Sequence, residues 1–302
     1  LSEISEISIS GLYDIDLKRA ERMSKDHNIP SFFSLGSLLN ASNAVSVVTP
    51  THSHYNITKQ ALDADCHVFI EKPITDNLNR ARALLKKAEE RNKIIQVGHI
   101  ERFNPAFMAL DKTDMTPRFI ETHRLAPFNP RGNDVPVILD LMIHDLDIIL
   151  SIVDAKIQDI RANGVRVVSQ TVDIANARIE FKNGCVANLT ASRISQKEMR
   201  KIRIFQEDNY ITIDFQAGIL EEYKVCHDKP ISAASEKVVE IGTDNKKYIL
   251  YNKPEIQKHD ALKEELLHFI HSIEYASQPE TNGTNATEAL RLALEIDRII
   301  NV

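Results

Sequence analysis

The chain has 302 residues, 43% of them hydrophobic and 26% charged, a composition typical of a globular protein long enough for two domains. Its net charge of −6 and isoelectric point near 6.0 argue against nucleic acid or an anionic membrane surface as main partner. No apolar run approaches the roughly 18 residues that cross a bilayer. The three cysteines, at positions 66, 185 and 226, show no metal or redox spacing, which favours a reduced, cytoplasmic protein without a metal site.

Strands and helices are predicted to alternate through residues 1 to about 98. Ile7 to Tyr13 reads as a strand that ends at Asp14, and Asp16 can cap a helix that runs to about His27. The further strands are predicted over residues 32–33, 44–48, 67–70 and 94–97, with helices over 34–40, 53–64 and 75–91. This alternation predicts an α/β domain with a parallel sheet of the Rossmann type.

The front of this domain is unusual. A dinucleotide-binding sheet normally opens with a strand, a G-x-G-x-x-G turn and a helix. The nine glycines lie too far apart to form that turn; they are at positions 11, 36, 98, 132, 164, 184, 218, 242 and 283. We expect that roughly 20–35 residues of a first β-loop-α unit precede Leu1 in the natural protein. The alternative, a different and single-sided sheet, stays open.

After Gly98 the pattern changes to strands without helices between them. A strand is predicted over 119–125, an apolar helix over 137–153, and a run of strands over residues 156–168, 173–182, 185–194, 201–206, 210–215 and 219–226. Residues 228–256 read as irregular, and two helices, over about 258–276 and 286–301, close the chain. We therefore predict two domains: a dinucleotide-binding domain over 1–98, and an α+β domain over 99–302 with a large mixed or antiparallel sheet for substrate binding and oligomerisation.

The segment Glu71-Lys72-Pro73 directly follows a predicted buried strand. In an open α/β sheet, ligands bind beyond the carboxyl ends of the strands. Pro73 restricts Lys72 to extended geometry, which helps to aim its side chain. The sequence thus predicts an ammonium group at the mouth of a cofactor site, although a lone Glu-Lys-Pro is more often a solvated loop.

The predicted helix over 137–153 is apolar except for a stripe of polar residues. Asp140, His144, Asp147 and Ser151 fall on one face at α-helical spacing. One turn between Asp140 and His144 lets both reach one small substrate, and histidine can take a proton from an alcohol near neutral pH. A satisfied core histidine is the competing interpretation.

Two further motifs lie at predicted strand ends. An acid such as Asp14, at the end of the second strand of a dinucleotide fold, accepts hydrogen bonds from the adenosine ribose and would repel a 2′-phosphate. NAD is therefore favoured over NADP. Thr49-Pro50-Thr51 follows the strand over 44–48, where its main chain and hydroxyls could line the cofactor.

Together these residues resemble the Gfo/Idh/MocA family of nicotinamide-dependent sugar oxidoreductases. The resemblance rests on Asp14, Thr49-Pro50-Thr51, His54, Glu71-Lys72-Pro73 and Asp140-x-x-x-His144 in this order, and it covers essentially the whole chain. The segments Val97–Pro105 and Asp140–Asp145 resemble a narrower group, the UDP-N-acetylglucosamine 3-dehydrogenases. The chain departs from the family in the absent glycine-rich turn.

The resemblance implies an NAD-dependent oxidation of a hydroxyl of a sugar or sugar nucleotide, of the UDP-N-acetylglucosamine type and at C3. Lys72 would stabilise the oxyanion, His144 would be the general base, and Asp140 would orient it. The implied cofactor-binding residues are Asp14, Thr49, Pro50, Thr51, His54, Glu71, Lys72 and Arg102. The implied substrate-binding residues are Arg102, Asn104, Arg124, Arg131, Asp140, His144 and Arg193; the arginines are candidates for the substrate's pyrophosphate.

Three other functions stay open at this point. They are a dehydrogenase of free sugars or inositols, a non-catalytic NAD- or sugar-sensing regulator of the same fold, and, least favoured, a metal hydrolase that uses His99, His123, Asp140 and His144. An open sheet commonly buries its exposed face against a second copy, and the family is usually dimeric or tetrameric, so a homodimer or homotetramer is expected.

Overall fold

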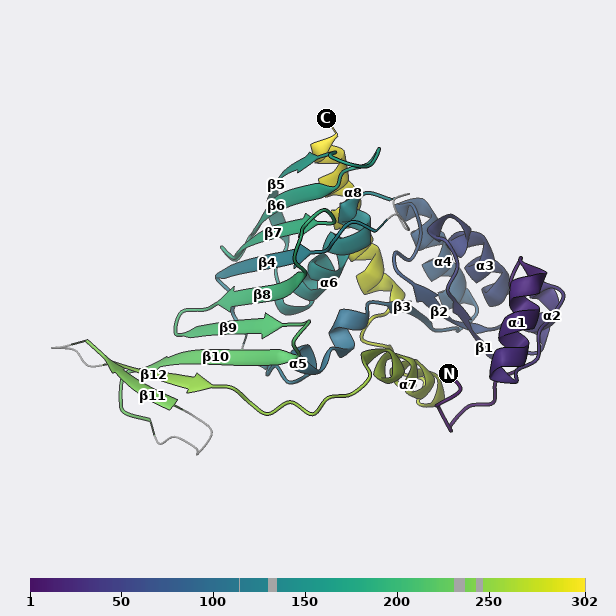
Figure 1. The fold of residues 1–302 in the computed structure, drawn as a ribbon, viewed down its shortest axis with the longest axis horizontal. Coiled ribbons are helices and arrows are strands. Elements are labelled where there is room, and N and C mark those ends of the chain that lie inside the picture. Colours follow the sequence, from purple (N-terminus) through teal and green to yellow (C-terminus); the bar gives the residue numbers. More distant parts are fainter. Residues whose placement is uncertain (114, 130–134, 231–236, 243–246, 302) are drawn as a thin grey trace. The chain divides into compact units, whose positions relative to one another are not determined.

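A computed structural model describes residues 1–113, 115–129, 135–230, 237–242 and 247–301 of the protein (Figure 1). Within these ranges the chain forms two units, residues 1–100 with 260–288, and residues 101–259 with 289–302. The predicted domains are 1–98 and 99–302. In the structure, residues 260–288 belong to the first unit. This assignment depends on contacts between residues far apart in sequence, and a local sequence pattern does not show such contacts.

The first unit is built on a parallel sheet in the order β1-β2-β3. Its elements are α1 (Leu17–His27), α2 (Leu35–Asn40), β1 (Ala44–Val47), α3 (Thr51–Asp63), β2 (His67–Glu71), α4 (Leu78–Glu90), β3 (Ile95–Gly98) and α7 (Ala261–Glu274). Ser34 and Asn77 cap α2 and α4 through their side chains, whereas α3 begins after Pro50 without a side-chain cap. Asp16 caps α1 by accepting hydrogen bonds from two main-chain N–H groups, as the sequence predicts.

The central strand β2 anchors the core of this unit. Its residues Val68, Phe69 and Ile70 are at most 1% exposed. The ring of Phe69 lies 6.0 Å from that of Phe269 on α7, between centroids, and Ile4 joins this cluster. A short predicted strand over 7–13 is reduced to one parallel bridge between Leu12 and Ser31.

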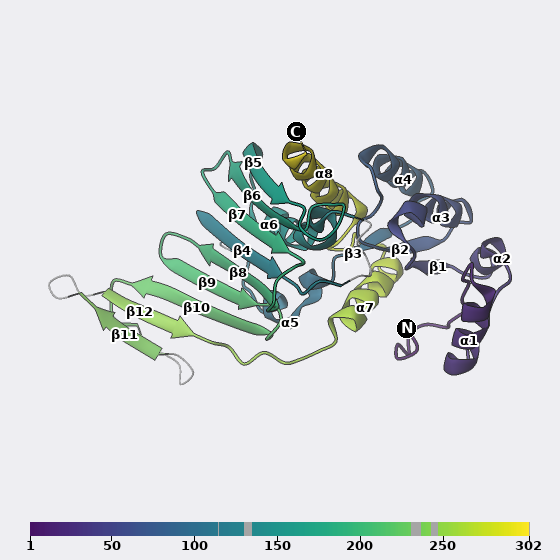
Figure 2. The same ribbon diagram turned by 45° about the horizontal axis from the view of Figure 1, so that its top comes forward.

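The second unit contains a nine-stranded sheet in the order β11-β12-β10-β9-β8-β4-β7-β6-β5 (Figure 2). The β4–β7 pair is parallel and the other pairs are antiparallel. The strands are β4 (Phe119–Leu125), β5 (Ile157–Val165), β6 (Ile174–Phe181), β7 (Val186–Ser192), β8 (Met199–Phe205), β9 (Asn209–Asp214), β10 (Ile219–Cys226), β11 (Lys237–Ile241) and β12 (Lys247–Asn252). The prediction that residues 228–256 are irregular is wrong for β11 and β12, which pair with each other and, through β12, with β10.

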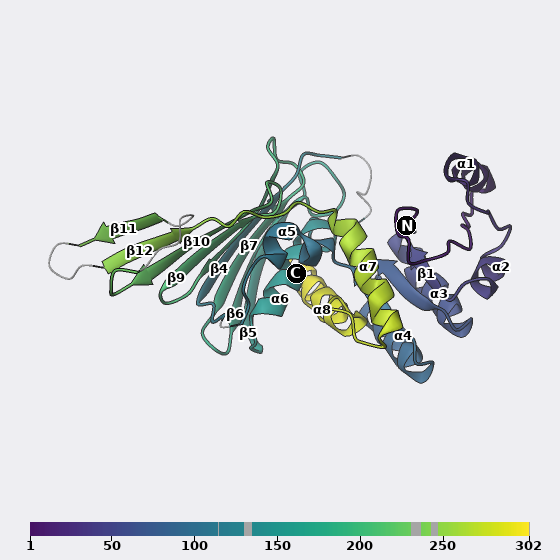
Figure 3. The same ribbon diagram turned by 90° about the horizontal axis from the view of Figure 1, so that it is seen from below.

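Helices cover one face of this sheet, and buried residues alternate along its strands. On β4, the side chains of Ile120, Thr122 and Arg124 point to the covered face and are at most 4% exposed. The helical segments are η1 (Ile100–Phe103), α5 (Pro105–Met108), η2 (Ile138–Met142), α6 (Ile143–Ile152) and α8 (Gly283–Ile300), of which α8 starts in the first unit and ends in the second. Within the second unit, α5 and α6 lie on the same side of the sheet (Figure 3).

The predicted fold class, a Rossmann-type parallel sheet followed by an α+β domain with a large mixed sheet, is confirmed. None of the described helices is long and apolar enough to cross a membrane.

Candidate active site

Three loops leave the carboxyl edge of the parallel sheet in the first unit. In the ladder, Ile70 of β2 pairs with Val47 of β1 and with Val97 of β3, so the three strands end at the same edge. Thr49-Pro50-Thr51 follows β1, and Lys72-Pro73 follows β2. This is the edge at which open α/β sheets bind their ligands.

Glu71 and Gly98 meet side by side at this edge. They are paired in the ladder, and a Cβ atom placed on Gly98 would lie 2.8 Å from Oε2 of Glu71. Glycine is therefore required for the carboxylate to rest against β3. The next residue, Lys72, is half-buried and is joined to Pro73 by a cis peptide bond.

The imidazole of His54 ties two of these loops together. His54 is 1% exposed; its Nδ1 lies 2.9 Å from the carbonyl oxygen of Pro73, and its Nε2 lies 2.7 Å from that of Thr49. Both ring nitrogens thus contact the main chain. In this structure His54 supports the loop that carries Lys72, while its direct contact with a cofactor stays a prediction.

Asp14 lies just before α1, and its carboxylate contacts two nearby residues of the same segment. Its Oδ1 accepts a hydrogen bond of 2.8 Å from the main-chain N–H of Asp16, and its Oδ2 lies 3.5 Å from a guanidinium nitrogen of Arg19. The side chain is 29% exposed, so the carboxylate can still accept hydrogen bonds from a ribose.

These residues fit one part of a nicotinamide dinucleotide. Asp14 can accept from ribose hydroxyls, and Thr49 and Thr51 offer hydroxyls at the same carboxyl edge as Lys72. The glycine-rich turn that would cradle the diphosphate is not present in the 302 residues. The described residues thus suit the ribose and nicotinamide ends of such a cofactor.

In the second unit, Asp140 and His144 lie on a helix that changes type between them. The main-chain N–H of Ile143 donates to the carbonyl of Ile138, five residues back, so η2 is π-helical before α6 begins. Both side chains are half-buried. A step of four residues stays close to one turn across this junction, and the joint action of Asp140 and His144 on one substrate stays a prediction.

The next two polar residues of this helix, Asp147 and Ser151, form hydrogen bonds within the protein. Asp147 is 2% exposed and accepts a hydrogen bond of 2.9 Å from Nε of Arg102. Ser151 donates to the main chain of Ile148. Asn104 caps α5 and donates to the carbonyl of Phe215. These contacts hold α6 and α5 in place.

Directly after His144, a second buried arginine holds Asp145. Arg124 on β4 is 4% exposed; its NH2 lies 2.8 Å from Oδ1 of Asp145 and its NH1 lies 2.7 Å from Oε1 of Glu101. Burial raises the pKa of Asp145, and the attraction of Arg124 only partly offsets this effect. The guanidinium thus fixes the helix turn that presents His144.

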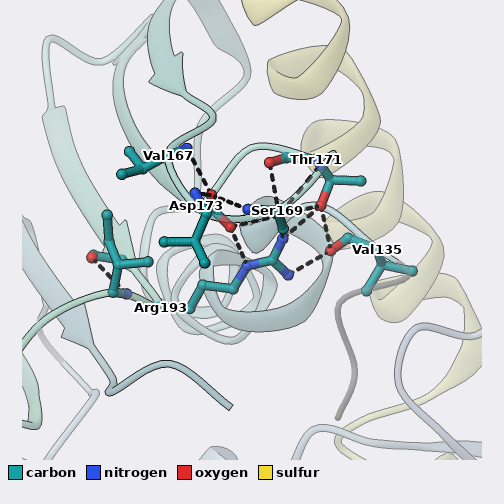
Figure 4. Close-up of polar contacts among 9 residues, drawn as sticks. Val135, Val167, Ser169, Thr171, Asp173 and Arg193 are labelled. Carbon is teal, nitrogen blue, oxygen red and sulfur yellow. Dashed lines mark hydrogen bonds and ion pairs between the residues drawn. The ribbon is translucent and has the colours of Figure 1, made fainter. Parts of the chain in front are cut away.

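Arg193 forms a third buried cluster, at the start of the same helix (Figure 4). Its Nε donates to Asp173 at 2.9 Å, its NH1 donates to the carbonyl of Val135 at 2.8 Å, and its NH2 donates to the hydroxyls of Ser169 and Thr171. Val135 lies three residues before η2. Arg193 therefore connects the chain entering η2 with the loop that follows β5.

Asp173 organises that loop. Its Oδ2 accepts hydrogen bonds from the main-chain N–H groups of Val167, Val168 and Ser169, at 2.7–2.9 Å, and its Oδ1 accepts one from the hydroxyl of Ser169. Burial alone would raise the pKa of Asp173, but the hydrogen bonds from Ser169, Val168 and Val167 outweigh it and lower the pKa well below its usual range.

Because the folded-state pKa of Asp173 is lowered, its stabilisation is present above the unfolded pKa of about 3.9 and is lost as the pH falls. We expect Asp173→Asn to lower the free energy of unfolding by about 2 kcal/mol at pH 7. Urea titrations of both proteins between neutral and acid pH should show this difference shrinking below about pH 4. A difference that is the same at every pH would contradict the role of the carboxylate charge.

The predicted site residues are thus divided between the two units. Lys72, Asp14, His54 and the Thr49–Thr51 loop lie in the first, and Asp140, His144 and Asn104 lie in the second. Arg102, Arg124 and Arg193 contact buried carboxylates, with side chains at most 8% exposed, so as substrate ligands they remain predictions. Arg131 lies outside the described residues. Among those described, no group of three His, Cys, Asp or Glu side chains could hold a metal ion.

The sequence reasoning missed the carboxylates that these arginines bind, namely Glu101, Asp145 and Asp173. Each lies in or beside an apolar stretch, and an acid in such a position needs a buried partner. That signal was available from the sequence, although the identity of the partner was not.

Two models of protein families match this chain. Residues 2–99 match the model of an oxidoreductase family with an NAD-binding Rossmann fold, and residues 119–220 match the Gfo/Idh/MocA C-terminal domain. The UDP-N-acetylglucosamine 3-dehydrogenase of Acidithiobacillus ferrooxidans is 41% identical over 216 residues, which are 71% of this chain and 69% of that protein. This chain belongs to the Gfo/Idh/MocA oxidoreductase family.

Solved structures of this family show the same fold. A structure of the Acidithiobacillus ferrooxidans UDP-N-acetylglucosamine 3-dehydrogenase has a TM-score of 0.86 and 34% identity, covering 96% of this chain and 89% of that one. The scyllo-inositol 2-dehydrogenase (NAD(+)) of Bacillus subtilis is 29% identical over 51% of this chain and 49% of its own. The predicted resemblance to Gfo/Idh/MocA sugar oxidoreductases is therefore confirmed.

Proposed function

We propose that this Gfo/Idh/MocA chain oxidises the C3 hydroxyl of a UDP-N-acetylglucosamine-type sugar nucleotide to a ketone, with NAD as the hydride acceptor. The observation that carries the proposal is the 41% identity to a UDP-N-acetylglucosamine 3-dehydrogenase. Glu71-Lys72-Pro73 after β2 and Asp140 and His144 on η2 and α6 supply the groups that such an oxidation needs.

In this proposal, each catalytic residue handles charge or a proton at the reacting hydroxyl. The ammonium of Lys72 stabilises the negative charge that develops on the oxygen. His144 takes the hydroxyl proton as general base, and Asp140 orients the imidazole or the substrate. NAD, when bound, accepts the hydride; Asp14, Thr49, Pro50, Thr51, His54, Glu71, Lys72 and Arg102 are the residues proposed to hold it.

The preference for NAD over NADP rests on Asp14. A carboxylate at this strand end accepts hydrogen bonds from the 2′-hydroxyl and repels a 2′-phosphate. Arg19 is the nearest cation, at 3.5 Å from Oδ2, and its side chain is 59% exposed. NADP-dependent turnover that equals NAD-dependent turnover would contradict this assignment.

We also propose that the protein assembles through the outer face of the nine-stranded sheet. Five aromatic rings form a continuous row across five strands on that face, with neighbouring centroids 4.6–5.7 Å apart; they belong to Phe119, Phe205, Tyr210, Tyr223 and Tyr251. A half-buried aromatic row of this kind marks a contact surface. Light scattering should give the mass of a homodimer or homotetramer, and a monomer at micromolar concentration would contradict the proposal.

The proposed reaction is tested with the full chain, NAD and a panel of substrates. UDP-N-acetylglucosamine should produce NADH, whereas N-acetylglucosamine and myo-inositol should produce little. Turnover of inositol without turnover of any UDP-sugar would favour the second candidate, an inositol dehydrogenase, which the similarity to the scyllo-inositol enzyme supports. Binding of NAD without turnover of any substrate would favour a non-catalytic sensor.

A further inference from the structure

We propose that Arg200, a residue outside the predicted site, binds the diphosphate of the nucleotide sugar. This inference rests on the proposed function, because only a nucleotide-sugar substrate carries that group. Arg200 lies on β8, directly opposite Arg124 in the β4–β8 ladder. Its side chain therefore projects from the same face of the sheet as Arg124, at the end where α6 presents His144 and Asp145.

Arg200 is linked through Glu101 and Arg124 to the residue that follows His144. Oε1 of Glu101 lies 3.9 Å from NH1 of Arg200 and 2.7 Å from NH1 of Arg124. Arg124 in turn lies 2.8 Å from Oδ1 of Asp145, the residue after His144. Two side chains, those of Glu101 and Arg124, thus separate Arg200 from the helix turn that carries His144.

The guanidinium of Arg200 is more exposed than those of the other arginines of this region, so it can contact a ligand. The side chain of Arg200 is 50% exposed, and among the described residues its ion-pair contact is the long one to Glu101. Glu101 also has the shorter contact with Arg124, so Arg200 can turn to a ligand without leaving Glu101 unpaired. By contrast, the guanidinium groups of Arg102 and Arg193 are buried against carboxylates and could turn to a ligand only by leaving them uncompensated.

The main chain holds Arg200 in place while its side chain stays open. The carbonyl oxygen of Arg200 accepts a hydrogen bond of 2.9 Å from the main-chain N–H of Phe215. The next cation along the strand, Lys201, is already paired with Asp214 at 3.0 Å. Arg200 thus supplies a partly exposed planar guanidinium on a main chain that is held in place, and this is the group best suited to bind two phosphate oxygens at once.

The test is the binding of UDP and of uridine to the full chain, measured by calorimetry, so that no turnover is needed. Arg200→Gln should weaken UDP binding by at least about tenfold and leave uridine binding unchanged, because the nucleoside lacks the diphosphate. Arg200→Lys keeps the charge but loses the planar guanidinium, so its affinity for UDP should lie between those of the wild type and Arg200→Gln. Arg203→Gln is the matched control: Arg203 is on the same strand with a side chain 38% exposed, but it projects from the opposite face and pairs with Glu121.

Each outcome decides the proposal. UDP affinity reduced in the Arg200 variants and retained in Arg203→Gln supports it. Equal UDP affinity of the wild type and Arg200→Gln overturns it, while the proposed reaction stands if UDP-N-acetylglucosamine is still oxidised. A wild type that neither binds UDP nor oxidises a UDP-sugar overturns the proposed function, and this inference with it.

Discussion

Replacing Arg124 with alanine is expected to lower the free energy of unfolding by about 3–5 kcal/mol, because it leaves two buried carboxylates with only the 3.9 Å contact between Glu101 and Arg200. Glu101 and Asp145 have side chains at most 8% exposed, and each lies within 2.8 Å of the guanidinium. The raised pKa of Asp145 means that proton uptake can relieve part of this cost. The variant should therefore recover some stability as the pH falls.

Urea unfolding followed by circular dichroism measures this effect. Arg203→Ala is the matched control, since that arginine also pairs with a glutamate across the β4–β8 ladder but is partly exposed, and it should cost no more than about 1 kcal/mol. A loss below about 1 kcal/mol in Arg124→Ala would show that the buried cluster does not hold the helix.

The second large effect is expected on turnover. Lys72→Ala should reduce kcat by about 10²–10³-fold, the usual cost of removing one group that stabilises a developing oxyanion. The Michaelis constant and the binding of NAD should change far less, because the proposed contact strengthens only in the transition state. Steady-state kinetics with UDP-N-acetylglucosamine, together with NAD binding by fluorescence, separate the two.

A surface lysine of the same unit provides the control. Lys86 on α4 has a side chain 78% exposed, and Lys86→Ala should behave like the wild type. Activity of Lys72→Ala within about threefold of the wild type would remove Lys72 from the mechanism.

Local patterns were sufficient for much of the fold. The apolar run before Glu71-Lys72-Pro73 predicts β2 because a strand buried on both faces has no polar positions. Alternation along residues 119–125 predicts β4, and Asp16 is a capping residue before an amphipathic segment. These features depend on neighbours within a few residues, so they are visible in the sequence.

Other features depend on contacts that the sequence does not show. The π-helical turn over Ile138–Met142 has the same apolar composition as an α-helix, so the sequence predicts one continuous α-helix there. The arginines were predicted as substrate ligands because exposed and buried guanidinium groups look alike in a sequence. Only the packed structure distinguishes Arg124, which meets two carboxylates, from Arg200, which stays half-exposed.

The most direct test of the proposed oxidation follows the hydrogen that leaves the sugar. The full chain is incubated with NAD and UDP-N-acetylglucosamine carrying deuterium at C3, and the nicotinamide product is analysed by mass spectrometry. The proposed function predicts NADH that contains the deuterium, together with a 3-keto sugar nucleotide. NADH without deuterium, or an unchanged C3 in the presence of turnover, would contradict it.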